Sequence, residues 1–502
     1  MLRQTAVRFF LLAFWVGTLA FPLFGKTPGH SFAFSPLART AYQNIVQLRF
    51  GEAGATLGRM QQQEPWNDIL PLLENYLDFL TVLIDDDRAA YRRLSKRMEP
   101  RLARIAAGDR KSPYFLYSQA EIRLQWAFLR GKYGDYLSSL SDIKQAYALL
   151  EMNRREHPDF MPNQKSLGIL HALVGNVPNE YQWAFRTLSG MHGSIEAGMQ
   201  ELETVLAYAR QHDFVFEDET RLACSFLQLH LQNKKTAAWQ TLQAGHLDPG
   251  SSPLVAFAMA SMALRTGQND AAIRLLENCP SGPAYHPFAY RYYLLGIAKL
   301  NRLDPDANQA LETFVQTFSG SNGLKEAYQK LAWYYLLRGD TAGYRARMAM
   351  VKTKGTDRSE PDKAALREAN SGEIPDVRLT RARLLFDGGY YQQAYDLLAH
   401  TASAYARPGK PALEYTYRLG RISDALGKVQ DAIRLYTQTV EAGAGMPWYF
   451  ACNAALQLGM LYEAHRDFAA ARAAFNRCLA LRPEEYAASL HAKAKAGLAR
   501  VR

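Results

Sequence analysis

The sequence predicts an all-α protein built of repeated helical hairpins. Apolar residues recur at helical spacing along nearly the whole chain, and no segment shows the strict alternation that is typical of a half-buried strand. In the last hundred residues one hairpin pattern occurs twice in the same register. A chain of 502 residues can form several cores, or a solenoid that lengthens without a single core.

The two copies carry small and aromatic residues at matching offsets. The repeat-structural residues are Gly420, Ala432 and Tyr436 in one copy, and Gly459, Tyr462, Ala471, Phe475 and Pro483 in the other. We expect the small residues to let two helices cross closely, the aromatic residues to fill the space between neighbouring hairpins, and Pro483 to stop a helix. This pattern resembles the tetratricopeptide repeat (TPR). The resemblance implies a TPR-type helical-hairpin solenoid, wound as a right-handed superhelix, with a curved binding surface.

Residues 1–33 have the pattern of a signal peptide. Arg3 and Arg8 precede an apolar run from residue 9 to 24, and Ser31-Phe32-Ala33 offers small residues at a cleavage site. The run is shorter than the roughly 20 residues of a spanning helix. We therefore expect an exported protein, periplasmic or otherwise extracytoplasmic. The alternative is a membrane anchor through residues 9–24.

The net charge of +11 favours anionic partners. Residues 1–33 contain three of the basic residues and no acidic residue, so a surplus remains after export. The surplus is spread along the chain, which argues against a nucleic-acid partner and leaves contact with an anionic membrane surface open. One local basic cluster, Lys493, Lys495, Arg500 and Arg502, is expected to be the solvated face of a capping helix.

The four cysteines predict neither a metal site nor a cofactor. Cys224, Cys279, Cys452 and Cys478 show no CxxC spacing and no paired histidines. Cys452 and Cys478 fall on the two helices of one expected hairpin. The sequence leaves open whether these two are thiols or a disulfide.

The expected order of segments follows from changes in composition and from the repeat spacing. Ala272 recurs as Ala310, 38 residues later, and the alanines at 394, 432 and 471 follow one another at intervals of 38 and 39 residues. This repeat length is slightly greater than the roughly 34 residues of a standard TPR. The aspartates at 85–87 are expected to cap a helix. After the signal peptide we expect N-terminal helical hairpins (34–159), an atypical insert (160–206), TPR-like repeats (207–352), a charged linker (353–376), C-terminal TPR repeats (377–483) and a capping helix (484–502).

The insert at 160–206 is apolar and glycine-rich. Leu167-Gly168-Ile169-Leu170, Val177-Pro178 and Ser189-Gly190 through Leu202 resemble the signature segment of the tetratricopeptide repeat protein thirty-nine family. That helical-repeat family is loosely tied to lipid and inclusion handling, and the resemblance supplies no catalytic residues. The insert is either a plug or an apolar pocket, and His171 and His192 are expected to be core or cap residues. The candidate pocket residues are Leu167, Leu170, Leu173, Val174, Trp183 and Phe185.

The first helix of each TPR hairpin lines the inner groove. Projecting the register places these residues in a partner groove: Trp333, Arg383, Phe386, Glu414, Tyr417, Arg421, Asp424 and Asn453. Arg383 and Arg421 can hold a carboxylate or phosphate through paired hydrogen bonds. The alternative is that Glu414 and Asp424 neutralise these arginines in an intramolecular ion-pair ladder.

The sequence contains no motif of an enzyme. It lacks a nucleophile elbow, a phosphate-binding glycine loop and a zinc-protease helix motif, so we expect no catalytic residues. We expect a non-catalytic exported scaffold or adaptor that binds protein or peptide partners in the cell envelope. The alternative is a carrier or sensor of an apolar, lipid-like ligand that uses residues 160–206.

Overall fold

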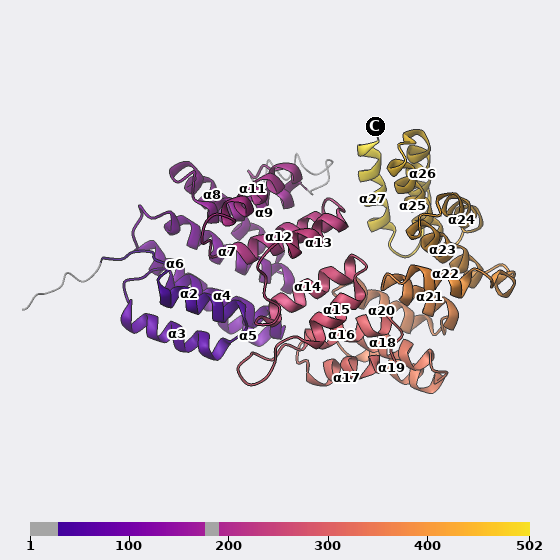
Figure 1. Cartoon of the computed structure of the whole chain (residues 1–502), viewed down its shortest axis with the longest axis horizontal. Helices are drawn as coiled ribbons and strands as arrows, with labels where there is room; N and C mark the ends of the chain where they lie inside the picture. The colour runs from indigo at the N-terminus through magenta and orange to yellow at the C-terminus, as the bar shows by residue number, and fades with distance from the viewer. Residues whose placement is uncertain (1–28, 176–189, 502) are drawn as a thin grey trace, which may run out of the picture.

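The computed structural model describes residues 29–175 and 190–501, and within these ranges the protein is helical (Figure 1). An isolated bridge between Ser31 and Asn67 is the one β-type pairing in the described part of the chain. The all-α prediction is confirmed. Most of the expected signal peptide, as well as Trp183 and Phe185, lies outside the described residues. Among the helices that are described, none combines the length and the apolar character needed to cross a membrane.

The helices follow one another with short connections. The first half of the chain contains α2 (Pro36–Val46), α3 (Phe50–Gln63), α4 (Leu70–Asp85), α5 (Arg88–Leu94), α6 (Met98–Ala106), α7 (Pro113–Tyr133), α8 (Tyr136–Glu156), α9 (Met161–Gly175), α11 (Ile195–Ala209), α12 (Glu217–His230) and α13 (Lys235–Gln243). The next group is α14 (Pro253–Arg265), α15 (Asn269–Glu277), α16 (Tyr290–Asn301), α17 (Ala307–Thr317), α18 (Leu324–Leu336), α19 (Thr341–Thr353) and α20 (Glu360–Ser371). The chain ends with α21 (Val377–Asp387), α22 (Tyr391–Leu398), α23 (Lys410–Ala425), α24 (Val429–Ala442), α25 (Phe450–Ala464), α26 (Phe468–Ala480) and α27 (Ala487–Arg500).

Several helices begin with the same local signal, a serine cap followed closely by proline. The serine side chain accepts a hydrogen bond from a backbone N–H of the first turn, and proline is tolerated there because its missing N–H would have no helical partner. The capping residues are Ser35 in α2, Ser112 in α7, Ser252 in α14 and Ser359 in α20.

Consecutive helices pack in adjacent pairs. Close pairs form between α7 and α8, α16 and α17, α18 and α19, α23 and α24, and α25 and α26. The recurring alanines all lie buried on the second helix of such a pair, at positions 272, 310, 394, 432 and 471. The register that the sequence predicts for these hairpins is therefore present in the structure.

Glycine on the first helix of a pair lets the second helix place an aromatic ring against it. A Cβ atom at Gly459 would lie 2.4 Å from the ring of Phe475, and one at Gly420 would lie 3.0 Å from the ring of Tyr436. Both rings are fully buried. The sequence predicted that Tyr462 and Phe475 fill the space between neighbouring hairpins. The Phe475 ring lies against Gly459 of its own hairpin and also against Gly497 of α27, whereas the Tyr436 ring lies against Gly420 within its own hairpin.

The other repeat-structural residues keep their expected places. Ala432 and Ala471 are fully buried, and Tyr462 is half-buried against the same C-terminal core. Helix α26 ends at Ala480, three positions before Pro483. The expected capping helix is α27, which packs against α25 and α26.

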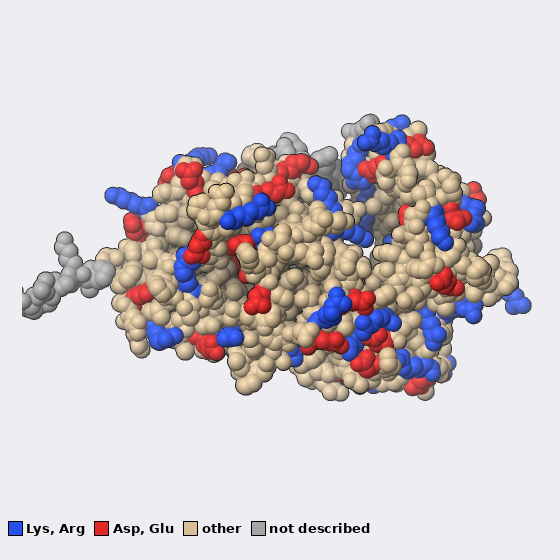
Figure 2. All heavy atoms as spheres, in the orientation of Figure 1, with Lys and Arg blue, Asp and Glu red and all other residues tan. Residues whose placement is uncertain are grey.

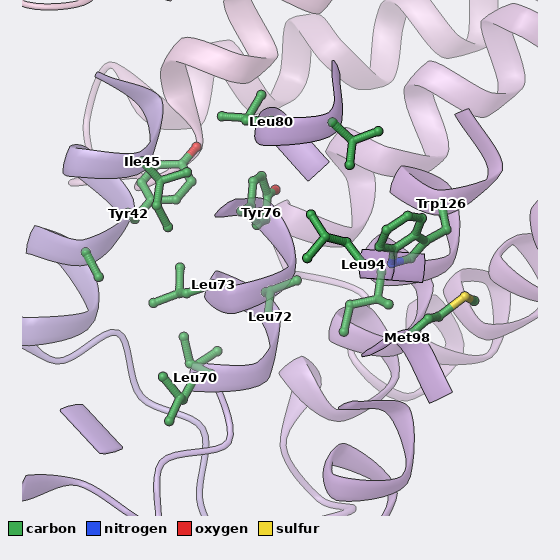
Figure 3. Close-up of a cluster of buried hydrophobic side chains, with 14 of the residues drawn as sticks. Tyr42, Ile45, Leu70, Leu72, Leu73, Tyr76, Leu80, Leu94, Met98 and Trp126 are labelled. Carbon is green, nitrogen blue, oxygen red and sulfur yellow. The ribbon is translucent and has the colours of Figure 1, made fainter. Parts of the chain in front are cut away.

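The N-terminal helices form a body with a larger core. Figure 3 shows side chains from α2, α4, α5, α6 and α7 converging on this core, with Trp126 among them. The indole N–H of Trp126 is buried, and it donates to Asn75 Oδ1 at 2.8 Å. A buried indole N–H needs such a partner, because leaving it unbonded would be destabilising.

Segments far apart in sequence close this body. The Tyr42 hydroxyl donates to Glu219 at 2.6 Å, and the Ser252 hydroxyl donates to the carbonyl oxygen of Val46 at 2.8 Å. His286 lies 2.6 Å from Asp85. Helices α2 and α4 thus contact residues about 200 positions later, unlike an ideal solenoid in which each repeat contacts only its neighbours.

The three consecutive aspartates have different partners, and Asp85 is the one that lies beside His286. Asp87 caps α5 by accepting from the backbone N–H of Ala89 at 2.7 Å, as the sequence predicts. Asp86 adopts a left-handed conformation with φ of 51° and accepts from the backbone N–H groups of Ser321 and Asn322. The capping interpretation therefore holds for Asp87 alone.

The expected charged linker contains a packed helix. Helix α20 lies against α18, and Asp362 at its start is fully buried. The Asp362 carboxylate accepts from the backbone N–H of Gly323 at 2.8 Å and from that of Glu326 at 3.1 Å. This segment is part of the helical packing and not a free tether.

Candidate functional site

A cavity of about 200 Å³ opens among the first helices of the last three hairpins, α21, α23 and α25. Five of the eight predicted groove residues line it. The complete lining is Ala382, Arg383, Phe386, Asp387, Tyr417, Arg418, Arg421, Ile422, Tyr449 and Asn453. Because α21 packs against α23 and α23 against α25, side chains on these inner faces converge.

Helical spacing explains why these residues share the cavity. Tyr417 and Arg421 lie four positions apart on α23, and Tyr449 and Asn453 lie four positions apart at the start of α25. Residues at this spacing stand one above the other on the same helix face. Each first helix therefore presents two or more polar side chains to the same space.

Each of two cavity arginines stacks on an aromatic ring. The guanidinium carbon of Arg383 lies 4.8 Å from the ring centre of Trp333, and that of Arg421 lies 4.9 Å from the ring centre of Phe386. Stacking holds the planar guanidinium group while leaving its N–H edge able to bind. Trp333 of α18 thus contacts Arg383 but does not itself line the cavity.

A hydrogen-bonded triad fixes the side chains beside Arg421. Asn453 Nδ2 donates to the Tyr417 hydroxyl oxygen at 2.8 Å, and Arg421 Nη1 donates to the same oxygen at 3.1 Å. Gln457 in turn donates to Asn453 Oδ1 at 3.1 Å. Two donors occupy the Tyr417 oxygen, so its own proton remains to be donated to a ligand.

The two predicted acidic groove residues bind other partners. Glu414 pairs with Arg418, and Asp424 accepts from the Tyr436 hydroxyl at 3.1 Å. Burial raises the pKa of the Asp424 carboxyl group, and the Tyr436 hydrogen bond and nearby Arg421 offset part of this effect. Asp424 is not among the lining residues.

The arginines are left with little carboxylate contact. Arg383 Nε lies 3.8 Å from Asp387 Oδ2, beyond hydrogen-bond distance, and 36% of the Arg383 side chain is exposed. Within the described ranges Arg421 forms no ion pair with an acidic side chain. The geometry therefore disagrees with the alternative in which Glu414 and Asp424 neutralise these two arginines.

The described part of the candidate apolar pocket is filled by packing. Leu167, Leu170 and Val174 are buried, while 46% of Leu173 is exposed. A Cβ atom at Gly198 would lie only 2.3 Å from the carbonyl oxygen of Gly168, so these glycines permit α9 and α11 to touch. The glycine-rich pattern of this insert thus has a structural explanation.

His171 has acidic partners that the sequence analysis did not foresee. Its Nδ1 atom lies 2.6 Å from Glu201 Oε2, and its Nε2 atom lies 3.8 Å from Glu151 Oε1. His171 is buried, in agreement with the expected core position, and its two acidic partners lie 20 or more positions away in sequence, on α8 and α11. The group joins three helices of the N-terminal body.

A buried ion cluster around Lys165 was also missed. Lys165 Nζ lies 2.8 Å from Glu219 and 3.6 Å from Glu121, and only 3% of its side chain is exposed. Burial alone would lower the pKa of Lys165, but the two carboxylates raise it well above its ordinary value. Tyr76 also donates to Glu219, at 3.2 Å. This cluster is enclosed within the body, and its groups satisfy one another.

Charge on the visible face is mixed. Figure 2 shows Lys and Arg side chains interspersed with Asp and Glu, without an extended basic area on this face. In the expected basic cluster, Arg500 pairs with Glu463 at 2.6 Å.

The cavity presents several donors and few acceptors. The guanidinium groups of Arg383 and Arg421 and the hydroxyl proton of Tyr417 can all serve an oxyanion. Tyr449 and Arg418 line the same space, and the sequence analysis did not include them. The helical register that placed Arg383 and Arg421 could also have identified Tyr449 and Arg418.

No protein-family model matches the chain, and no curated protein sequence matches it.

Proposed function

We propose that the protein is a non-catalytic, exported scaffold that binds an acidic group of a protein or peptide partner in its C-terminal cavity. The observation that carries this proposal is the pair of stacked arginines. Arg383 and Arg421 face one cavity, and neither makes a close ion pair with a carboxylate. A carboxylate or phosphate bound there would receive paired hydrogen bonds from preorganised donors.

The proposed architecture is a TPR-type solenoid with a right-handed superhelical path. The glycine and aromatic contacts within α23–α24 and α25–α26 support this proposal, as does the packing of successive first helices. Export is proposed from the basic and apolar pattern of residues 1–33. In this arrangement the last three hairpins supply the binding surface.

The size of the cavity limits what enters it. A volume of about 200 Å³ is below the usual range of roughly 300–1,000 Å³ for small-molecule sites. It suits one acidic side chain or terminal group, while the rest of the partner lies outside along the first helices. Phe386 and Tyr449 provide apolar area for the carbon atoms next to the acid.

The test is affinity capture from a native cell-envelope extract, with residues 34–502 as the immobilised protein. Beside the parent, an Arg383→Ala, Arg421→Ala variant removes both stacked guanidinium groups. A matched control, Arg434→Ala, Arg477→Ala, removes the same charge from exposed positions of α24 and α26 outside the cavity. Captured proteins and lipids are both identified by mass spectrometry.

The proposal expects a protein that binds the parent and the control but not the cavity variant. Its binding to the parent should then be measured directly after purification, together with competition by its own acidic segment. Equal capture by all three proteins would contradict the cavity as the binding site. Capture of acyl lipid without dependence on the arginines would contradict the scaffold proposal itself.

A further inference from the structure

Two buried cysteines face one another between α25, which carries part of the cavity lining, and α26. Cys452 of α25 and Cys478 of α26 have their sulfur atoms 3.6 Å apart, although they are 26 positions apart in sequence. Both side chains are almost completely buried. The sulfur atoms already lie in van der Waals contact, and a disulfide requires them to approach to about 2.05 Å.

The local environment also prepares one sulfur as the nucleophile. The hydrogen bond between the two sulfur atoms and the charge of Arg482 lower the pKa of Cys452, and burial opposes part of this shift. The same hydrogen bond and burial raise the pKa of Cys478. Of the two sulfur atoms, that of Cys452 is therefore the one that loses its proton more readily, and thiolate is the attacking form.

The other two cysteines provide an internal comparison. Cys224 on α12 and Cys279, just beyond α15, are buried thiols. Burial raises the pKa of Cys224 to about 11, which suppresses its thiolate form. Geometry and acidity together thus single out Cys452 and Cys478.

We propose that Cys452 and Cys478 are a dithiol pair that closes to a disulfide by exchange with a low-molecular-weight disulfide such as glutathione disulfide. The Cys452 thiolate attacks one sulfur of glutathione disulfide, which releases one glutathione thiolate and leaves a mixed disulfide. Cys478 loses its proton and attacks the protein sulfur of that mixed disulfide, releasing the second glutathione. Two protein thiols are oxidised, one glutathione disulfide is reduced to two thiols, and two protons are transferred in total.

Helix α27 controls the access of an oxidant to Cys452 and Cys478. Helix α27 covers this region, with the carbonyl oxygen of Leu490 4.0 Å from the Cys478 sulfur. Helix α27 packs against α25 and α26, and a helix with few neighbours opens locally at lower free energy than a core does. Oxidation is therefore expected before α27 has docked during folding, or during its transient opening afterwards.

The bond would fasten the helix that carries part of the cavity. Tyr449 and Asn453, which line the cavity, flank Cys452 at the start of α25. A disulfide to α26 would hold this helix in place and constrain the unfolded chain. The proposed bond does not depend on the proposed binding function, and the two are tested by separate measurements.

The experiment incubates the reduced full chain with an excess of glutathione disulfide, both as the folded protein and during refolding from denaturant. The protein is then denatured without reductant, its remaining thiols are alkylated, and its peptides are identified by mass spectrometry. The expected result is one peptide pair linked through Cys452 and Cys478, the loss of two alkylatable thiols, and full alkylation of Cys224 and Cys279. Subsequent reduction should restore four alkylatable thiols.

Two variants make the outcome decisive. A Cys224→Ala, Cys279→Ala variant should form the same link, because it keeps the pair. A Cys478→Ala variant should stop at the mixed disulfide, with one glutathionyl group on Cys452. Complete alkylation of both Cys452 and Cys478 in the parent, after refolding with glutathione disulfide, would overturn the proposal, as would a preferred link to Cys224 or Cys279.

Discussion

The N-terminal body and the C-terminal hairpins use charged residues in opposite ways. In the body, Lys165 and Glu219 are buried together and joined to residues of other helices. In the C-terminal hairpins, Arg383 and Arg421 face a cavity and stack on aromatic rings. The comparison indicates that charge is paired inside the fold in the first region, whereas in the second the arginines face a cavity, where the proposed function uses them for binding.

The sequence separation of contacting residues also differs between the N-terminal body and the C-terminal hairpins. Tyr42 and Glu219 are 177 positions apart, and Asp86 and Asn322 are 236 apart. In the C-terminal hairpins, Tyr417 and Asn453 are 36 positions apart and Tyr436 and Asp424 only 12. A region joined by distant contacts should unfold as one unit, whereas neighbouring hairpins can open one after another from the chain end.

The largest expected effect is that of Lys165→Ala. The substitution leaves Glu121 and Glu219 without their shared cation inside the body. Breaking a buried ion pair by removing one partner lowers the free energy of unfolding by about 3–5 kcal/mol. Urea unfolding, followed by hydrogen exchange that resolves the two regions, should show the loss in α2, α4, α7 and α12.

A matched variant separates charge from packing at this position. Lys165→Met keeps much of the side-chain volume and removes the charge, so it should be nearly as destabilising as Lys165→Ala. If Lys165→Met were instead as stable as the parent, packing and not ion pairing would explain the burial of this lysine. Exchange rates in α23–α26 should stay unchanged in both variants.

The second effect concerns the long-range contact at Asp86. Asp86→Gly keeps a residue that tolerates the left-handed conformation but removes the acceptor of two backbone N–H groups, at Ser321 and Asn322. Leaving buried donors unsatisfied should lower the free energy of unfolding by about 1–3 kcal/mol. Asp86→Asn is the control for these N–H groups, because its side-chain oxygen can still accept while both variants lose the charge that pairs with Lys132 at 2.9 Å. Amide exchange at 321 and 322 should rise in the glycine variant and little in the asparagine variant.

The hairpin crossing at Gly459 should be sensitive to a single methyl group. A Cβ atom there would lie 2.4 Å from the Phe475 ring, so Gly459→Ala must displace a buried side chain. Overpacking of this kind lowers the free energy of unfolding by about 1–3 kcal/mol. Gly445→Ala is the control, because a Cβ atom at Gly445 meets no atom within 4 Å. Destabilisation by the control as large as that by Gly459→Ala would contradict the steric explanation.

Acid should weaken the contact that Asp86 makes with Ser321 and Asn322. Burial opposes the charge of Asp86, but Lys132 and the two backbone N–H groups lower its pKa below the ordinary value. A lowered pKa in the folded state means that the stabilisation is present above the unfolded-state pKa, near 4, and is lost as the pH falls through the folded-state value. The effect should be smaller than that of Asp86→Gly, since a protonated carboxyl group can still accept hydrogen bonds. Exchange at 321 and 322 as a function of pH measures it, and Asp86→Asn should abolish the dependence.

Contacts within and between adjacent helices of the C-terminal hairpins could be predicted from the sequence. The glycine at 459, the ring at 475 and the arginines at 383 and 421 all follow from spacing within or between adjacent helices, which periodicity reports directly. The ion cluster of Lys165 could not be predicted in this way. Its partners Glu121 and Glu219 are 44 and 54 positions away on other helices, and nothing in helical spacing encodes which distant faces meet.

The same reasoning explains why the partners of Asp86 and of His171 could not be predicted from the sequence. Capping is a local interaction, so Asp87 was assigned correctly, while Asp86 binds a loop in the middle of the chain. His171 pairs with Glu201 across a helix contact that depends on Gly168 and Gly198. Sequence patterns thus identified elements and their faces, and the closing of the N-terminal body required the structure.

The smallest expected effect tests whether the cavity arginines are free for binding. Arg383→Ala and Arg421→Ala each remove one stacking contact with a ring, worth about 0.5–2 kcal/mol, and Arg421→Ala also removes the hydrogen bond to Tyr417. Neither should approach the loss caused by Lys165→Ala, and urea unfolding under identical conditions compares them. A loss as large as that of Lys165→Ala would mean that these arginines hold the hairpins together, and the contrast between the regions would fail. A small loss, combined with abolished partner capture, would show that the C-terminal hairpins keep their charge for a ligand because local packing already stabilises them.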